Sequence, residues 1–118
     1  TFLAALFHGI LILGITFKEN CADLRNTRVV DLARELGEYR AQVQIHDPWA
    51  NAEEARREYG VEMIDTPQAG AFDAVVVAVA HDEFRALGAA GARAYGRPGA
   101  LLYDIKSLYP RAEVDARL

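Results

Sequence analysis

The chain has 118 residues, 52% of them apolar, which is enough material for one compact domain with a hydrophobic core. Its formal net charge of −4 excludes the basic surface expected of a protein that binds nucleic acid or an acidic membrane. Its single cysteine, Cys21, excludes an internal disulfide and a cysteine-based metal site, and it favours a reducing, cytoplasmic location.

Residues 1–9 are predicted to be a connector between domains or an expression-derived lead, and the domain itself is predicted to span 10–118. Because Thr1 stands in place of an initiator methionine, we expect a piece of a longer protein. The apolar opening is broken by His8 and Gly9, has no basic flank and is slightly short for a membrane span. We therefore expect neither a signal peptide nor a membrane anchor.

The first half of the domain is predicted to form a strand, a helix and a second strand. A continuous apolar run at 10–15, rich in β-branched residues, is typical of a parallel strand covered on both faces. From an N-cap at Asn26 or Thr27, apolar residues recur at spacings of three and four, which predicts a helix ending near 37–40. The alternating segment 41–46 predicts a strand that stops at Asp47-Pro48.

The second half continues this alternation. Residues 50–59 carry alanines and paired charges suited to an exposed helix, and 61–64 predict a brief strand. The apolar run 74–79 predicts another strand, followed by a glycine-weakened helix over 83–94 and a last strand over 99–103. This order predicts an α/β fold, a Rossmann-like three-layer αβα domain with a five-stranded, mainly parallel sheet.

Polar side chains follow the ends of the predicted strands. Sheets of this kind bind ligands at the carboxyl ends of their strands, near the point where the strand order reverses. Among eleven arginines the chain has only two lysines, and both Lys18 and Lys106 follow predicted strands, as do Asp47, His81 and Asp104. We therefore expect the functional residues at this edge.

The segment 14–27 is a polar loop with one early glycine. It lacks the G-x-G-x-x-G pattern that lets a dinucleotide approach a helix N-terminus, so we do not expect the main site of a dinucleotide cofactor here. Lys18 and Arg25 are candidates for contacts with two anionic groups, Arg25 near the positive end of the helix. Alternatively, Arg25 pairs with Asp23 and Lys18 with Glu19 in a solvated loop.

Two further groups of residues have open interpretations. His81 is a candidate general acid or base, because histidine titrates near neutrality, but packing is the alternative, with Asp82 or Glu83 capping the next helix. Lys106 could reach a phosphate or a uracil carbonyl, or it could form a surface pair with Asp104.

The string GITFKENCADLRNT at 14–27 closely resembles the opening of the UDP-binding C-terminal domain in the UDP-glucose and GDP-mannose dehydrogenase family. The resemblance covers residues 10 to about 108 and continues through VVDL, HDPW, AVAHDEF and DIK, which begin at residues 29, 46, 78 and 104. Ala22 departs from the proline expected between Cys21 and Asp23.

Three short motifs look most like the branch that oxidises UDP-N-acetylhexosamines for capsule, O-antigen and Vi-type polysaccharides. They are ENC at 19–21, LRNT at 24–27 and the Ala80-His81 pair. The UDP-glucose branch more often has Asp-Gly-Arg at the position of 104–106. The resemblance therefore implies UDP-N-acetylglucosamine or UDP-N-acetylgalactosamine as the substrate.

The family resemblance also implies a division of labour within a larger, cytoplasmic enzyme. An N-terminal Rossmann domain binds NAD, a helical segment forms a homodimer, and the present domain closes over the UDP-sugar while C6-OH is oxidised to a carboxylate. The catalytic cysteine of the family belongs to the part of the family sequence absent here, and Cys21 does not match it. We therefore expect no catalytic residue and no metal in this chain, which should be inactive alone.

Residue by residue, the resemblance implies that Phe17 and Lys18 contact the UDP-sugar, that Lys106 contacts UDP, and that Arg25 reaches the NAD phosphates. It implies no role for His81. The rival interpretation is a free-standing, non-catalytic flavodoxin-like module with a nucleotide-binding or regulatory role. A receiver domain is disfavoured, because only Asp65 follows the third predicted strand where such a domain needs a cluster of acids.

Overall fold

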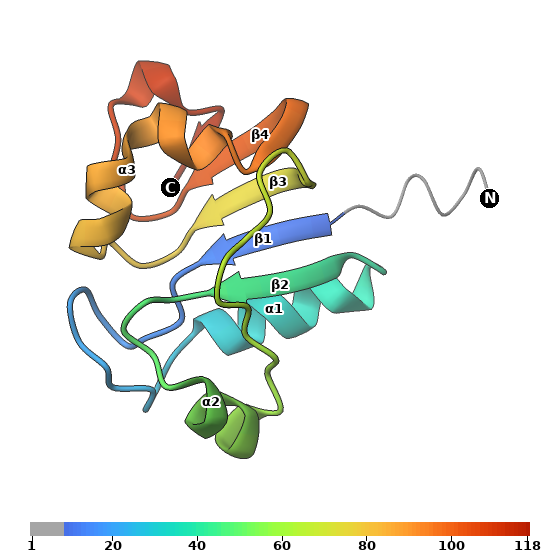
Figure 1. Cartoon of the computed structure of the whole chain (residues 1–118), viewed down its shortest axis with the longest axis vertical. Coiled ribbons are helices and arrows are strands. Elements are labelled where there is room, and N and C mark those ends of the chain that lie inside the picture. Colours follow the sequence, from blue (N-terminus) through green and yellow to red (C-terminus); the bar gives the residue numbers. More distant parts are fainter. Residues whose placement is uncertain (1–8) are drawn as a thin grey trace.

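The chain folds around a sheet of five parallel strands in a computed structural model that describes residues 9–118. Figure 1 shows how the sheet and the helices are arranged. The strand order is β2-β1-β3-β4-β5, and each neighbouring pair is parallel. The strands are β1 (Gly9–Leu13), β2 (Gln42–His46), β3 (Phe72–Val77), β4 (Gly96–Asp104) and β5 (Ala116–Arg117). Because β2 and β3 flank β1 on opposite sides, the strand order reverses between β1 and β3.

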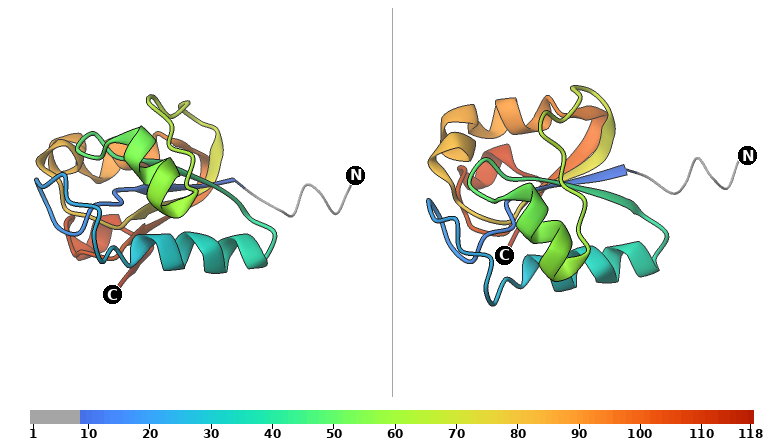
Figure 2. Two further views of the ribbon diagram at one scale, coloured as in Figure 1. Left: turned by 90° about the horizontal axis from the view of Figure 1, so that it is seen from below. Right: turned by 60° about the horizontal axis from the view of Figure 1, so that its bottom comes forward.

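Helices cover both faces of the sheet (Figure 2). Helix α1 (Val29–Glu38) packs on one face and α3 (Asp82–Arg93) on the other. Helix α2 (Ala52–Tyr59) contributes Ala55 to the core on the α1 side, and the 3-10 helix η2 (Arg111–Glu113) lies between β4 and β5. This arrangement confirms the predicted three-layer α/β fold.

Neighbouring residues of the central strands divide between two hydrophobic cores. Leu11 and Leu13 of β1 and Val75 of β3 join the core under α3, whereas Ile12 and Val76 join the core under α1. Each of these five side chains is at most 6% exposed. A strand buried on both faces has no polar side, which explains why the sequence shows continuous apolar runs here.

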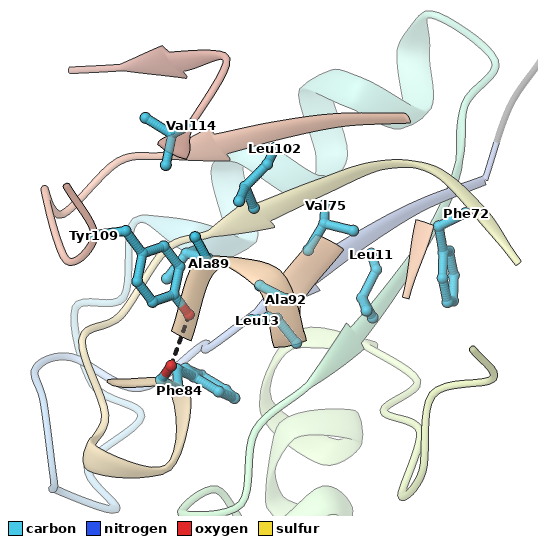
Figure 3. Packing of buried hydrophobic residues seen from close by; sticks show 11 residues of the cluster. Leu11, Leu13, Phe72, Val75, Phe84, Ala89, Ala92, Leu102, Tyr109 and Val114 are labelled. Atoms are coloured by element: carbon cyan, nitrogen blue, oxygen red, sulfur yellow. Dashed lines mark hydrogen bonds between the residues drawn. The ribbon is translucent and has the colours of Figure 1, made fainter. Parts of the chain in front are cut away.

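Helix α3 is kinked at Gly88, whose φ of 69° and ψ of 169° are not helical. In the half before the kink, the carbonyl of Phe84 accepts a 2.6 Å hydrogen bond from the Tyr109 hydroxyl (Figure 3). Burial, reinforced by the nearby Asp104 carboxylate, raises the pKa of Tyr109 to about 12. Tyr109 therefore stays neutral and ties the segment after β4 to α3.

The predicted strand at 61–64 is wrong. Only Met63 pairs with β2, through a single parallel bridge to Ile45, and Ile64 N donates to the Ile45 carbonyl at 2.9 Å. The start of the segment is held elsewhere, since Val61 N donates to the Ala55 carbonyl of α2. Val61 and Met63 pack against the core under α1 and Ile64 packs against the core under α3, so the segment does not continue the sheet as a strand.

The fifth strand of the sheet is β5, which sequence patterns did not indicate. Its two residues are exposed, so they carry no apolar signal. The preceding Asp115 holds this segment on β4, because its N–H donates to the Leu102 carbonyl and its carboxylate accepts from Leu102 N. The chain thus keeps the predicted count of five strands with a different fifth member.

Several predicted boundaries shift by a few residues. Helix α1 has its N-cap at Arg28 rather than at Asn26 or Thr27, and β3 begins and ends two residues before the predicted 74–79. Gly9, which we assigned to the lead, is the first residue of β1, and the rest of that lead, 1–8, lies outside the described residues. Within 9–118, no helix combines the length and hydropathy that crossing a bilayer requires.

Candidate functional site

A pocket of about 640 Å³ opens at the carboxyl ends of the central strands, on the α1 side of the sheet. It lies where the strand order reverses, the position at which ligands bind in open α/β sheets. Its walls come from the loop between β1 and α1, from the first turns of α1 and from the ends of β3 and β4. The lining residues are Thr16, Phe17, Asn26, Arg28, Val29, Leu32, Ala78, Tyr103, Ile105, Lys106 and Leu118.

The structure brings two of the four predicted binding residues together at this pocket. Phe17, 53% exposed, and Lys106 both line it, although they are 89 residues apart in the chain (106 minus 17). Lys18 and Arg25 belong to the same loop as Phe17 but are not among the lining residues. The predicted site is therefore split between the pocket wall and the outer part of the loop.

The pocket combines apolar walls with two basic groups. Val29, Leu32 and Ile105 are apolar surfaces of the kind that hold a flat ring, and Arg28 and Lys106 are exposed cations suited to phosphate oxygens. Arg28 also lies at the N-cap of α1, where the helix dipole favours an anion.

Sequence reasoning missed Arg28 and Tyr103 as pocket residues. Arg28 directly follows the predicted loop, but neither its residue type, one of eleven arginines, nor its place in the predicted helix marks it as a binding residue. Tyr103 was treated only as the last residue of a strand. In the structure it belongs to the α1-side core and lines the pocket.

Arg25 forms the local ion pair that was the alternative to a ligand contact. Its Nε and Nη2 donate to the two carboxylate oxygens of Asp23 at 3.0 and 2.9 Å. These bonds lower the pKa of Asp23 to about 2. The Arg25 side chain is 86% exposed, so the pair lies in solvent and contributes little to folding.

Asp104 and Lys106 do not form the surface pair that was the alternative interpretation of Lys106. Asp104 is fully buried, and its Oδ2 accepts from Tyr109 N at 2.8 Å on the α3 side of the sheet. Its Oδ1 has no hydrogen-bond partner within the described part of the chain. Lys106 is exposed at the pocket, whereas the Asp104 carboxylate is buried in the protein, so the two charged groups lie in different surroundings.

Four polar residues form a second, closed group at the same edge of the sheet, here named the His81 cluster: Thr16, Asn20, Asp47 and His81. The His81 side chain is fully buried. Its Nε2 lies 2.9 Å from Asp47 Oδ2 and 3.1 Å from Thr16 Oγ1, and its Nδ1 accepts from Asn20 N at 2.9 Å. His81 therefore has a packing role, with no free ring nitrogen for acid-base chemistry.

The sequence suggested Asp82 or Glu83 as the cap of helix α3, but neither residue caps it. The side-chain Oδ1 of Asn20 accepts from Asp82 N at 2.9 Å, so the cap comes from the distant loop after β1. His81 occupies the N-cap position but makes no side-chain cap bond. Glu83 Oε1 instead accepts from Trp49 Nε1 at 2.9 Å.

Asp47 connects β1, β2 and β3 through a buried carboxylate. Burial by itself raises the pKa of a carboxyl group, but hydrogen bonds from His81 and from the amides of Ile15 and Trp49 outweigh it and hold the pKa of Asp47 below its usual value. The amide bonds measure 2.7 Å to Oδ2 from Ile15 and 2.7 Å to Oδ1 from Trp49. Asp47 is therefore a structural acid. It stands at the position where dinucleotide folds have a ribose-binding acid, but its carboxylate is bonded to the protein itself.

The residues after β1 do not fit a dinucleotide pyrophosphate. Gly14 packs so closely on Val79 that an added Cβ would lie 2.6 Å from Val79 Cβ. At the start of α1, the first helical amide, Val29 N, already donates to Thr27 Oγ1 at 3.2 Å. Val79 and Thr27 thus take up space and an amide donor that a dinucleotide pyrophosphate would use at this position.

A parallel α/β sheet with a partly basic pocket at its switch point defines a ligand-binding domain of the Rossmann-like class. Residues 11–111 match the family described as "UDP-glucose/GDP-mannose dehydrogenase family, UDP binding domain". The chain belongs to this family. This agrees with the family that the loop at 14–27 resembled.

Two similar proteins are dehydrogenases of UDP-N-acetylhexosamines by name. The chain is 50% identical over 109 residues to "UDP-N-acetyl-D-glucosamine 6-dehydrogenase" of Pseudomonas aeruginosa, covering 92% of this chain and 26% of that protein. It is 47% identical over 110 residues to the protein of the same name from Salmonella typhi, covering 93% and 26%. The chain thus spans about a quarter of the length of these relatives.

Two solved structures share the fold at low sequence identity. A UDP-D-ManNAc dehydrogenase from Pyrococcus horikoshii superposes with a TM-score of 0.68 at 21% identity, over 92% of this chain and 24% of that one. The UDP-N-acetyl-mannosamine dehydrogenase Cap5O from S. aureus superposes with a TM-score of 0.65 at 16% identity, over 92% and 25%.

Proposed function

We propose that this chain is the nucleotide-sugar-binding domain of an NAD-dependent UDP-sugar 6-dehydrogenase. The observation that carries the proposal is the pocket at the switch point of the sheet, with Phe17, Arg28 and Lys106 on its wall. Membership of the UDP-binding family supports UDP as the nucleotide. The relatives at 47% and 50% identity support oxidation at C6 of UDP-N-acetyl-D-glucosamine, with the C6 hydroxyl becoming a carboxylate.

In this proposal the pocket residues divide the nucleotide between them. Lys106 and Arg28 contact the diphosphate, because compact and forked cations both suit phosphate oxygens. Phe17 and the apolar wall hold the uracil or the sugar ring, and Lys18 contacts the nucleotide sugar from the outer part of the loop. The proposed catalytic cysteine lies outside this chain, so the chain binds without catalysing.

NAD is proposed as the hydride acceptor of the complete enzyme, bound mainly outside this chain. Arg25 is the one residue here proposed to reach the cofactor phosphates. Its exposed guanidinium would then exchange the Asp23 carboxylate for a phosphate, since each of these groups can accept two parallel hydrogen bonds from an arginine.

The complete enzyme is proposed to be a cytoplasmic homodimer that supplies uronic acids for a surface polysaccharide such as capsule or O-antigen. A relative named "Protein CapL" from Staphylococcus aureus, 44% identical over 73 residues, supports the capsule assignment. That match covers 62% of this chain and 17% of CapL.

Calorimetry on this chain tests the proposal with UDP, UDP-N-acetylglucosamine and ADP. We expect weak binding of UDP and of UDP-N-acetylglucosamine, because the pocket is open and a complete site would be shared with other domains. ADP, with the same diphosphate but a larger base, is expected to bind less tightly. Tighter binding of ADP than of UDP would overturn the assignment.

A further inference from the structure

His81 is a fully buried polar residue at the functional edge. Its ring is 0% exposed, and its two nitrogens contact residues from two other segments of the chain, 34 to 65 residues away in sequence. The pocket does not include it, so it does not contact a ligand there. Its bonds lead instead to the loop between β1 and α1, residues 14–28, hereafter the β1–α1 loop.

The hydrogen bonds of His81 define one protonation state of its ring. Asn20 N–H is a donor, so Nδ1 accepts and carries no hydrogen. Asp47 Oδ2 is an acceptor, so Nε2 carries the hydrogen and donates to it. Thr16 Oγ1 donates to the Lys18 carbonyl at 3.0 Å, which leaves its oxygen as a second acceptor for the same hydrogen. The neutral Nε2–H tautomer satisfies every bond.

This tautomer fixes the β1–α1 loop at two points. At the first, Thr16 lines the pocket and is followed by Phe17, which also lines it. At the second, Asn20 has a φ of 53°, an uncommon conformation for a residue other than glycine, and its side chain caps α3 through Asp82 N. Between these points Lys18 and Glu19 are exposed. The loop tip that carries Phe17 and Lys18 is therefore held from both sides by His81.

We propose that His81 is a positioning residue for nucleotide-sugar binding, acting through the Nδ1 bond to Asn20 that orders the β1–α1 loop beside the pocket. A loop already ordered before binding spares the ligand the entropy cost of ordering it, so loss of this bond weakens affinity without removing a ligand contact. The inference rests on the proposed function and adds to it a residue that the ligand does not touch.

Two substitutions separate the two nitrogens of the ring. In His81→Asn, the side-chain oxygen occupies the position of Nδ1 and still accepts from Asn20 N–H, but the donor to Asp47 is lost. In His81→Gln, the amide reaches the position of Nε2 and still donates to Asp47, but the acceptor for Asn20 is lost. The proposal therefore expects opposite outcomes for affinity and for stability.

Calorimetry with UDP provides the binding test. His81→Gln is expected to weaken UDP binding about tenfold, the effect of one lost hydrogen bond, whereas His81→Asn stays within about twofold of the unaltered chain. His81→Asn is expected to unfold more easily than His81→Gln, because it leaves the buried Asp47 carboxylate without its ring partner. A His81→Gln variant that binds UDP as tightly as the unaltered chain would overturn the role of His81. Failure of the unaltered chain to bind UDP would instead overturn the proposed function.

Measurements on the unaltered chain need no variant and test the loop directly. Nitrogen NMR at neutral pH is expected to show His81 with a bare Nδ1 and a protonated Nε2, and the Asn20 amide is expected to exchange slowly with solvent. Addition of UDP should slow that exchange further, because binding and loop order are linked in both directions. A protonated Nδ1, or an Asn20 amide that exchanges freely and ignores UDP, would overturn the proposal. Trp49, the single tryptophan, stacks on the His81 ring at 6.0 Å between centroids, so its fluorescence reports on the surroundings of that ring.

Discussion

The two sides of the β1–α1 loop face very different surroundings at the same edge of the sheet. On the α1 side, the loop borders an open pocket with exposed cations and apolar walls. The other side is a closed half, in which Thr16, Asp47 and His81 of the His81 cluster are buried and joined by hydrogen bonds, with the Trp49 ring stacked on His81. Thr16 belongs to both sides, since it lines the pocket and contacts His81.

One edge of the sheet thus carries both an open pocket and a buried polar network. Polar loops gather at the carboxyl ends of parallel strands, and in this chain the polar groups around His81 are hydrogen-bonded to one another. A buried polar network is favourable only when its members are paired, and the pairing makes it rigid. The open half, which is the pocket, is thereby bordered by a rigid wall against which a ligand can bind. Substitutions in the two halves should therefore change different quantities.

A substitution at Gly14 should cause the largest loss of stability, because Gly14 begins the loop that both halves share. Its φ is 101°, and an added Cβ would lie 2.6 Å from Val79 Cβ and 2.9 Å from Val79 N. Gly14→Ala is expected to destabilise the chain by about 3 kcal/mol, combining backbone strain with overpacking. Urea unfolding measures the change, and UDP binding should fall with it because both sides of the loop shift.

Gly70→Ala provides the matched control for Gly14→Ala. Gly70 has a φ of 71°, but an added Cβ would meet nothing within 4 Å. This variant carries only the backbone strain, so we expect a loss of about 1 kcal/mol. Equal losses in the two variants would show that the contact between Gly14 and Val79 contributes nothing.

Asp47→Asn should cause the next largest loss of stability, and the change should be confined to the His81 cluster in the closed half. The substitution removes a carboxylate whose pKa is lowered by the hydrogen bonds of His81 and two amides. Stability from a lowered carboxyl pKa is fully present above the unfolded value of about 4 and is lost as pH falls through the lower folded value. We therefore expect a loss of about 2 kcal/mol near neutral pH that shrinks as the pH falls below about 4.

Urea unfolding between neutral and acid pH measures this dependence. Asp65→Asn is the control, because Asp65 is an exposed acid outside the His81 cluster. A difference between Asp47→Asn and the unaltered chain that persists unchanged at acid pH would contradict an ionised, hydrogen-bonded Asp47.

The fold was predictable from the sequence where burial produces a pattern. The runs at 10–15 and 74–79 lie on strands with both faces covered, so their apolar character is continuous and visible. The segment 61–64 shows the same character, but its apolar side chains are divided between the two cores, and its only bridge to the sheet is at Met63. Conversely, β5 is two exposed residues held by Asp115, and no local pattern marks it.

The site was predictable only to the extent that chain order places residues at the sheet edge. Lys106 follows a strand, so its presence at that edge could be expected, and Phe17 came from the family resemblance. Neither principle predicts that Arg28 joins them. The partners of His81 lie 34, 61 and 65 residues away in the chain, and only tertiary packing brings them together.

Lys106→Ala should give the smallest change in stability and should confine its effect to the open half. Lys106 is exposed at the pocket wall, so its loss should leave the free energy of unfolding within about 0.5 kcal/mol of the original. If it contacts the diphosphate, UDP binding should weaken about tenfold. In the complete enzyme the same substitution should raise KM more than it lowers kcat, as expected when an interaction is equal in the ground and transition states.

Arg111→Ala separates a specific contact from a general effect of charge. Arg111 is an exposed cation in η2 that does not line the pocket, so its removal changes the net charge equally. We expect UDP affinity to stay within about twofold, since an exposed charge outside the site is screened by salt. If the two variants weaken UDP equally, Lys106 acts only through the overall field of the protein. If Lys106→Ala lowers kcat more than it raises KM, Lys106 acts in the transition state, and the division between an open binding half and a closed structural half would have to include catalysis.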